Sequence, residues 1–296
     1  MIDAPESIKS PEFNQTPSHR SGFGTQFTIL AVVEEAETAR RCLAVAEQAA
    51  QIDSRASVVA LHICADPSHL VAAPEEICLQ RLRVALEGSA LQRMANVHFT
   101  VAKWVAFTQL DNLSWVERVG AVAPTLVTEA KNANLIVIAA PHNMDSVDAL
   151  HAAIFNTHRP VLFVPTQMPV PTDLGRHLAI AWKPCSQARR AILGALPWLR
   201  AASTVSVVAV DEPSITPNTP EAIKLLASYG IIAHAIHLRT APGEHVADRL
   251  LQELGVLRAN ALVMGAYRFG ELVEWIFGGV TREILHRSRL PVFLSH

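Results

Sequence analysis

The 296-residue sequence carries one pattern of strands and helices twice, and this repeat constrains the fold more than any other feature. Residues 28–43 read TILAVVEEAETARRCL and residues 177–192 read HLAIAWKPCSQARRAI, which share Ala-Arg-Arg at an offset of 149 residues (188 − 39). Three further matches follow in the same order: SVVALHI with TVSVVAV (offset 147), ANLIVIAA with ANALVMGA (offset 126), and PVLFV with PVFL (offset 131). Four matches in one order indicate two related halves.

Each half alternates short apolar, β-branched runs with helical stretches, which predicts a parallel sheet covered on both faces. In the first half we expect strands near 27–33, 57–63, 97–103, 134–139 and 160–165, and helices near 36–52, 75–94, 120–132 and 147–157. In the second half we expect strands near 177–182, 204–210, 231–238, 260–265 and 291–295, and helices near 186–200, 218–229, 243–257 and 279–288.

The repeat also sets the expected domain boundaries. Residues 1–24 are polar, rich in Ser and Pro, and lack the apolar core of a signal peptide, so we expect a disordered tail. The first domain then covers 25–165 and the second 177–296. Residues 166–176 form the expected linker, in a segment with several prolines.

Composition excludes several classes of protein. Half of the residues are hydrophobic and 18% are charged, so the chain is not disordered as a whole. A net charge of −2 gives no electrostatic reason to expect nucleic acid, and no apolar run reaches the roughly 20 residues of a membrane span. Four cysteines without a C-x-x-C pair favour a reducing compartment, which predicts the cytoplasm.

The sequence nominates no metal ligands and no catalytic residues. His234 and His237 lie three apart in an expected strand and therefore point to opposite faces, while His62 reads as a satisfied core or strand-end histidine. Neither a G-x-S-x-G nucleophile elbow nor a G-x-x-x-x-G-K-[ST] phosphate loop is present. Asp211 and Glu212 follow a strand, and either form a polar strand exit or approach a ligand or cation.

Glycines in the second half suggest a phosphate site. A strand runs into Gly265, and the pair Gly278-Gly279 opens a later helix. Glycine lets the backbone approach an anion, and free N–H groups at a helix N-terminus favour phosphate. The alternative is that these glycines only end a strand and permit a tight turn.

Residues 261–296, ALVMGAYRFGELVEWIFGGVTREILHRSRLPVFLSH, resemble the C-terminal signature of the universal stress protein family. Nucleotide-binding members carry G-2x-G-9x-G-[ST] in this place. The resemblance implies an α/β fold of two tandem α/β sandwich domains. Each has a mostly parallel five-stranded, Rossmann-like sheet of the adenine nucleotide alpha hydrolase type.

The resemblance also implies a binding site for ATP or another adenine nucleotide, with departures. Gly265 and Gly278 match the first and third motif glycines, but the second falls on Arg268 and the Ser/Thr position on Gly279. The family's adenine-contacting acid falls on Lys183. We therefore expect weak binding or none. The full set of expected cofactor-binding residues is Ala181, Trp182, Lys183, Val208, Gly265, Ala266, Arg268, Gly278, Gly279, Val280 and Thr281.

The first half departs further, because Ala139 stands where Gly265 stands in the second. We expect no phosphate site there and a structural role instead. The resemblance then implies a non-enzymatic stress-response factor that acts by binding other proteins, with any nucleotide held in the second half. A nucleotide-free interaction scaffold and a weak ATP hydrolase remain alternatives.

The final strands of the halves, PVLFVP at 160–165 and PVFL at 291–294, are apolar and lack the charges that protect an exposed sheet edge. We expect them to pair, so that the second domain is the partner of the first in an intrachain pseudo-dimer. This is how single-domain members of the family dimerise. Alternatively both strands lie inside their own sheets and the halves touch only through helices. A homodimer of the whole chain stays open.

Overall fold

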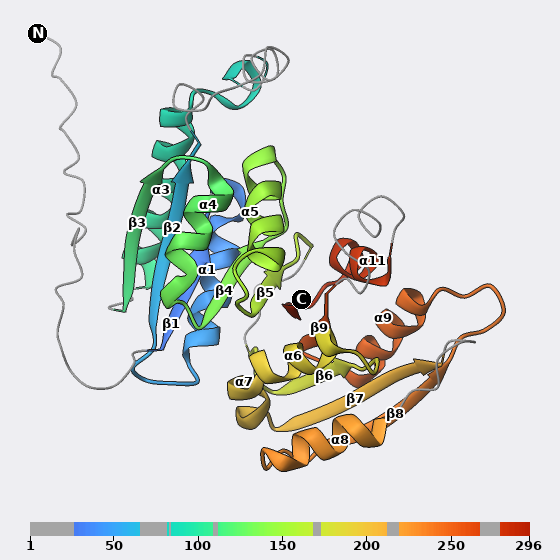
Figure 1. Ribbon diagram of the computed structural model, residues 1–296. Helices are drawn as coiled ribbons and strands as arrows, with labels where there is room; N and C mark the ends of the chain where they lie inside the picture. The colour runs from blue at the N-terminus through green and yellow to red at the C-terminus, as the bar shows by residue number, and fades with distance from the viewer. Residues whose placement is uncertain are drawn as a thin grey trace, which may run out of the picture.

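The computed structural model describes residues 27–65, 82, 84–108, 112–167, 173–211, 219–266 and 279–296. These residues form a ten-stranded sheet with helices on both faces (Figure 1). The strand order is β3-β2-β1-β4-β5-β10-β9-β6-β7-β8. Every neighbouring pair is parallel except β5–β10, which is antiparallel. The strand order of the first half, β3-β2-β1-β4-β5, therefore recurs in the second as β8-β7-β6-β9-β10.

In the first half the strands are β1 (Thr28–Val32), β2 (Ser57–Cys64), β3 (Leu113–Val119), β4 (Leu135–Ala139) and β5 (Val161–Val164). The helices are α1 (Ala36–Ala50), α3 (Ala90–Thr108), α4 (Val122–Glu129), the 3-10 turn η2 (Ala130–Asn132) and α5 (Met144–Phe155).

In the second half the strands are β6 (His177–Ala181), β7 (Thr204–Asp211), β8 (His234–Arg239), β9 (Ala261–Gly265) and β10 (Val292–Ser295). The helices are α6 (Ser186–Gly194), α7 (Leu196–Ala201), α8 (Thr219–Ser228), α9 (Val246–Leu257) and α11 (Val280–Arg287).

The strand pairing repeats with the same offsets as the sequence. Thr28 lies opposite Ser57 between β1 and β2, and His177 lies opposite Thr204 between β6 and β7, which reproduces the offsets 149 and 147. The β4–β5 and β9–β10 pairs reproduce the offsets 126 and 131 in the same way. A residue of the first half can therefore be matched to its structural counterpart in the second.

Alternating residues of each central strand fill two separate cores. Ile29 and Ala31 of β1 point to a core covered by α1, α3, α6, α7 and α8. Leu30 and Val32 point to the opposite core, covered by α4, α5, α9 and α11. Both cores run across the two halves. The strands are apolar on both faces because helices cover both.

The two final strands join the halves. Phe163 of β5 lies opposite Val292 of β10, and Leu162 lies opposite Phe293. The pairing expected from their sequences is present. The alternative, in which the halves touch only through helices, is wrong, although β5 also pairs with β4 and β10 with β9 inside their own halves. Phe163 and Phe293 are 2% and 1% exposed, and the ring of Trp198 packs 5.0 Å from that of Phe293.

The strand expected near 97–103 is wrong. These residues lie within the helix α3, and the third strand of the first half is β3. The β-branched and aromatic run VHFTV suggested a strand, but the buried residues Val97, Val101 and Trp104 are spaced four and three apart. That spacing forms one face of a helix, which packs against α1 and β2. Of the helix expected near 75–94, residues 82, 84–87 and 90–94 are helical, the last of these as the start of α3, and residues 75–81 and 83 lie outside the described residues.

The remaining differences are small. The helix expected at 186–200 is divided into α6 and α7 at Ala195, and Pro197 occupies the first turn of α7. The expected tail at 1–24 and the middle of the expected linker, 168–172, lie outside the described residues. Of the described helices, none is long and apolar enough to cross a membrane.

Candidate functional site

The structure brings several of the sequence-predicted residues together at the carboxyl edge of β6, β7 and β9. Ala181 lies between Val208 of β7 and Met264 of β9 in the sheet. The Trp182 N–H donates to the carbonyl of Val208 at 2.8 Å, which extends this pairing by one residue. In a doubly wound sheet this edge is where ligands bind.

Gly265 has a structural reason to be glycine. A Cβ atom placed on it would lie 2.7 Å from the backbone nitrogen of Ala188 and 2.8 Å from the carbonyl carbon of Gln187. Both atoms belong to the first turn of α6, and backbone atoms cannot move aside as a side-chain end can. Close helix–strand packing therefore accounts for this residue without a ligand.

Other members of the predicted set are inaccessible. Trp182, Val208, Ala266 and Thr281 are all buried, so their side chains serve packing in this state. Val280 is exposed and Lys183 partly so. Gly279 is the N-cap of α11 and makes no side-chain cap hydrogen bond. Arg268 and Gly278, which the resemblance also implied, lie outside the described residues.

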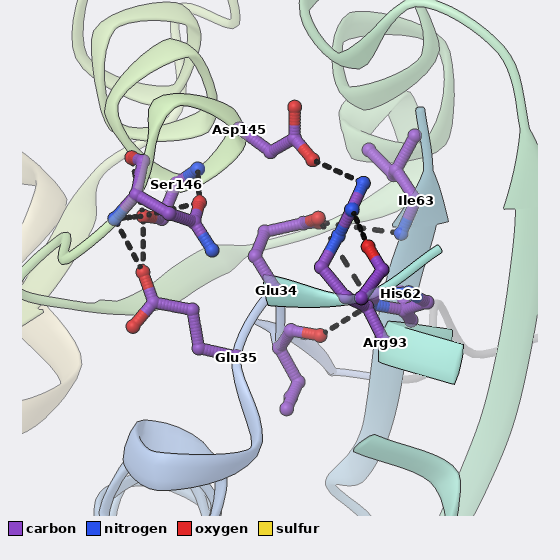
Figure 2. A network of polar contacts seen from close by, with 10 residues as sticks. Glu34, Glu35, His62, Ile63, Arg93, Asp145 and Ser146 are labelled. Atoms are coloured by element: carbon purple, nitrogen blue, oxygen red, sulfur yellow. Dashed lines mark hydrogen bonds and ion pairs between the residues drawn. The ribbon is translucent and has the colours of Figure 1, made fainter. Parts of the chain in front are cut away.

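The first half contains a buried polar cluster at the corresponding edge, which the sequence analysis missed (Figure 2). It forms where β1 ends and α1 begins, at Glu34 and Glu35, both of which are buried. Carboxylates are rarely buried unless they are paired or hydrogen-bonded, so each needs a specific environment. β1 lies between β2 and β4, and the strand order switches at this point.

The Glu35 carboxylate binds the N-terminus of α5. Its Oε1 accepts hydrogen bonds from the backbone N–H groups of His142 at 2.8 Å and Asn143 at 3.0 Å. The hydroxyl of Ser146 donates to the same oxygen. The other oxygen, Oε2, lies 3.1 Å from His142 Nδ1. All of these donors belong to the segment that enters α5.

A capping box fixes the start of α5. The Asn143 side chain accepts from the Ser146 N–H at 3.0 Å, and the Ser146 hydroxyl accepts from the Asn143 N–H at 3.1 Å. Asn is strongly preferred at helix N-caps because its side chain satisfies such a backbone group, and Ser146 at position N3 completes the box. The loop therefore presents its N–H groups in a fixed geometry, with Glu35 against them.

Glu34 and His62 form the neighbouring part of the cluster. His62 Nδ1 lies 2.8 Å from the carbonyl oxygen of Val33, which only accepts, so Nδ1 carries the proton. Glu34 Oε1 accepts from the Ile63 N–H at 3.3 Å, and Glu34 Oε2 lies 3.9 Å from His62 Nδ1. Burial lowers the pKa of His62, against the opposing effect of the Val33 hydrogen bond. This confirms the reading of His62 as a satisfied core histidine.

An ion pair next to the cluster links the helices α3 and α5. Arg93 of α3 lies 3.9 Å from the carboxylate of Asp145 in the first turn of α5. Arg93 also donates to the carbonyl of Gly88 at 2.8 Å. Both charged side chains are mostly buried, so the pair ties α3 to the start of α5.

Two signals in the sequence could have located this cluster. Glu34 and Glu35 directly follow the first strand, which places two carboxylates at the edge where ligands bind. The offset of 149 also matches them to Lys183 and Pro184, so the halves differ in charge at two adjacent structural positions.

The structure also shows the surroundings of His234, His237 and Asp211, to which the sequence assigned no definite role. His237 Nε2 contacts the Thr219 hydroxyl at 2.8 Å, while His234 is exposed. Within the described part of the chain, no group of three His, Cys, Asp or Glu residues is arranged to hold a metal ion. Asp211 lies 3.6 Å from Arg239 in an exposed pair, and Glu212 falls outside the described residues.

Comparison with solved structures identifies the fold. A universal stress protein from Archaeoglobus fulgidus DSM 4304 superposes with a TM-score of 0.62 over 92% of this chain and 99% of that chain, at 15% identity. A structure assigned to the universal stress proteins from Pseudomonas aeruginosa UCBPP-PA14 has a TM-score of 0.51 over 90% of this chain and 92% of that chain, at 17% identity. No family model matches the sequence, and neither does any curated protein sequence. The chain has the fold of the universal stress proteins, as the resemblance of residues 261–296 implied.

Proposed function

We propose that the chain is a non-enzymatic binding protein of the universal stress type. Its second half holds an adenine nucleotide weakly, and other proteins recognise the resulting state. The observation that carries this proposal is the difference between the halves at two adjacent structural positions: Glu34 and Glu35 in the first half correspond to Lys183 and Pro184 in the second. A lysine in place of two carboxylates favours a ligand of negative charge.

The start of α11 supports an anionic ligand in the second half. The first N–H groups of a helix have no partner within the helix, and they carry a partial positive charge. Gly279 contributes no side chain that would cover them, and Val280 beside it is exposed. Phosphate binds readily at such a helix end.

Several features argue that the affinity is low. Lys183 stands in place of the acid that contacts adenine in the family. The side chains of Trp182 and Val208 are buried and engaged in packing. The glycine at Gly265 is explained by α6 rather than by a ligand. We expect a dissociation constant for ATP weaker than about micromolar, which corresponds to less than about 8 kcal/mol of binding free energy.

Because the packing of Gly265 against α6 needs no ligand, it favours a second candidate function, a scaffold that binds proteins without any nucleotide. Mass spectrometry of the small molecules released on denaturing the purified protein separates the two. A released adenine nucleotide supports the nucleotide-binding protein. If no nucleotide is released and ATP at millimolar concentration gives no heat of binding, the scaffold is supported.

A matched pair of variants locates the site. Val280→Asp places a carboxylate at the start of α11, where it stabilises the helix but repels phosphate. Val256→Asp makes the same change at an exposed position of α9. We expect ATP binding to be lost only in Val280→Asp. Equal binding by both variants would place the nucleotide elsewhere.

The proposed location is the cytoplasm, and the proposed role is non-enzymatic. Cys42, Cys64 and Cys185 are free thiols, which is consistent with a reducing cytoplasm. A weak ATP hydrolase would need a carboxylate positioned for metal or water, and the candidate Asp211 instead pairs with Arg239 at the surface. Turnover of ATP that is lost in Asp211→Asn would revive that alternative.

A further inference from the structure

The carboxylate of Glu35 is buried at the N-terminus of a helix. The residue is 5% exposed, and its carboxylate accepts hydrogen bonds from two backbone N–H groups and one hydroxyl. Burying a carboxylate is costly unless such donors replace water. Backbone N–H groups at a helix N-terminus are also the donors that bind phosphate in doubly wound folds.

At the position that matches Glu35, the second half carries no carboxylate. The counterpart of Glu35 at the offset of 149 is Pro184, which has neither a charge nor a side-chain acceptor. The counterpart helix α11 begins at Gly279 without a side-chain cap, whereas α5 begins at Asn143 with a complete capping box. Among the described residues, a carboxylate of the chain is bound at the start of α5, whereas the start of α11 has no side-chain cap.

We propose that Glu35 is an internal anion that occupies the phosphate position of the first half and closes it to phosphorylated ligands. The donors around it suit a phosphate or phosphate monoester: two N–H groups and the Ser146 hydroxyl, with His142 Nδ1 3.1 Å from the second carboxylate oxygen. Removing the carboxylate opens this position to inorganic phosphate. The inference concerns the first half alone and holds whether or not the second half binds ATP.

The test uses the full chain with Glu35→Ala and a matched control, Glu37→Ala. Glu37 is an exposed residue in the first turn of α1, so its variant makes the same change in charge without touching α5. Inorganic phosphate is titrated at constant ionic strength. The backbone amide resonances of His142, Asn143 and Ser146 report binding at α5, and the melting temperature reports its effect on stability.

We expect Glu35→Ala to melt several degrees below the wild type and to recover at least half of that loss in phosphate, with saturation. The three amide resonances shift in this variant only. Wild type and Glu37→Ala show no saturable response at α5. Phosphate binding at these amides in the wild type, or its absence in a folded Glu35→Ala, overturns the proposal.

A Glu35→Ala chain that does not fold in chloride alone is also a decisive outcome. Refolding is then carried out in phosphate or formate against chloride at equal ionic strength. A folded yield restored by the small anions supports the proposal, because an external anion replaces the carboxylate. A variant that no anion restores shows that Glu35 is a purely structural group, and the proposal is wrong. ATP binding in the Glu35→Ala and wild-type chains, measured in parallel, tests the second half separately.

Discussion

The two halves of this chain share strand order and pairing register, but they differ at the edge where ligands bind. In the first half that edge is filled by the protein's own charged groups, with Glu35 bound to α5 and Glu34 beside His62. In the second half the matching positions are Lys183, Pro184 and Ala209. The comparison teaches that a repeated fold preserves the apolar sheet while the charged groups at the strand ends diverge.

The largest expected effect comes from the junction that both halves share. Phe163→Asp buries a carboxylate among apolar side chains between β5 and β10, which should lower the free energy of unfolding by more than about 4 kcal/mol. Denaturant unfolding measures the loss. Faster proteolysis of the 166–176 linker should accompany it, because the halves then separate more readily.

The matched control for the junction is Phe99→Asp. Phe99 is exposed on α3, so the same substitution should change stability by less than about 0.5 kcal/mol. Similar losses in the two variants would show that the β5–β10 pairing carries no special share of the stability.

Two glycine variants test whether the second-half edge is shaped by packing. Gly265→Ala forces a Cβ against the backbone of α6 and should destabilise the protein by about 1–3 kcal/mol. Gly255→Ala lies in α9 with open space around it and should stabilise by roughly 0.5–1 kcal/mol. Thermal unfolding without ligand shows both. Opposite signs support the packing account, and a neutral Gly265→Ala argues against it.

His62 should make stability depend on pH, because burial holds its pKa below the ordinary value of 6.5. Between its lowered pKa and 6.5 the unfolded chain binds more protons, so stability rises with pH in this window and is fully present above it. His62→Gln should remove this part of the slope. The control His234→Gln changes an exposed residue and should retain it. Unfolding curves from pH 5 to 7.5 that keep the same slope in His62→Gln would contradict the assignment.

The smallest effect is expected at the surface of the second half. Arg189 donates to Glu221 at 2.8 Å, joining α6 to α8, but the arginine side chain is about half exposed. Water and salt screen such a pair, so Arg189→Ala should cost less than about 1 kcal/mol. A larger loss that disappears in high salt would show that this pair contributes more than an exposed ion pair normally does.

Much of the fold was predictable because burial on both faces leaves a strong signal. The central strands are nearly continuous apolar runs, and the four repeat offsets reappear as strand registers. The third strand of the first half was misplaced for a physical reason. Val97 and Val101 favour strands locally, but their spacing buries them on one face of α3, and tertiary packing overrides local propensity. β3 itself, at the sheet edge, is only partly buried and shows a weaker pattern.

The candidate site was harder to predict, because the reasons for a glycine or a carboxylate lie in distant residues. Gly265 is required by Gln187 and Ala188, which belong to another element. Glu35 reads as an ordinary polar residue before a helix, and only the fold brings it to Asn143, 108 residues away. Periodicity in the sequence reports burial, but it contains no information about which polar groups meet at a strand end.

Hydrogen exchange of the full-length wild type with and without saturating ATP tests the central claim most directly, because it reads both helix ends in one sample. The account predicts slower exchange of the amides at 279–284, where α11 begins, and unchanged exchange at 139–146, where Glu35 occupies the start of α5. Protection at 139–146 would contradict it, since a nucleotide would then bind where the chain supplies its own anion.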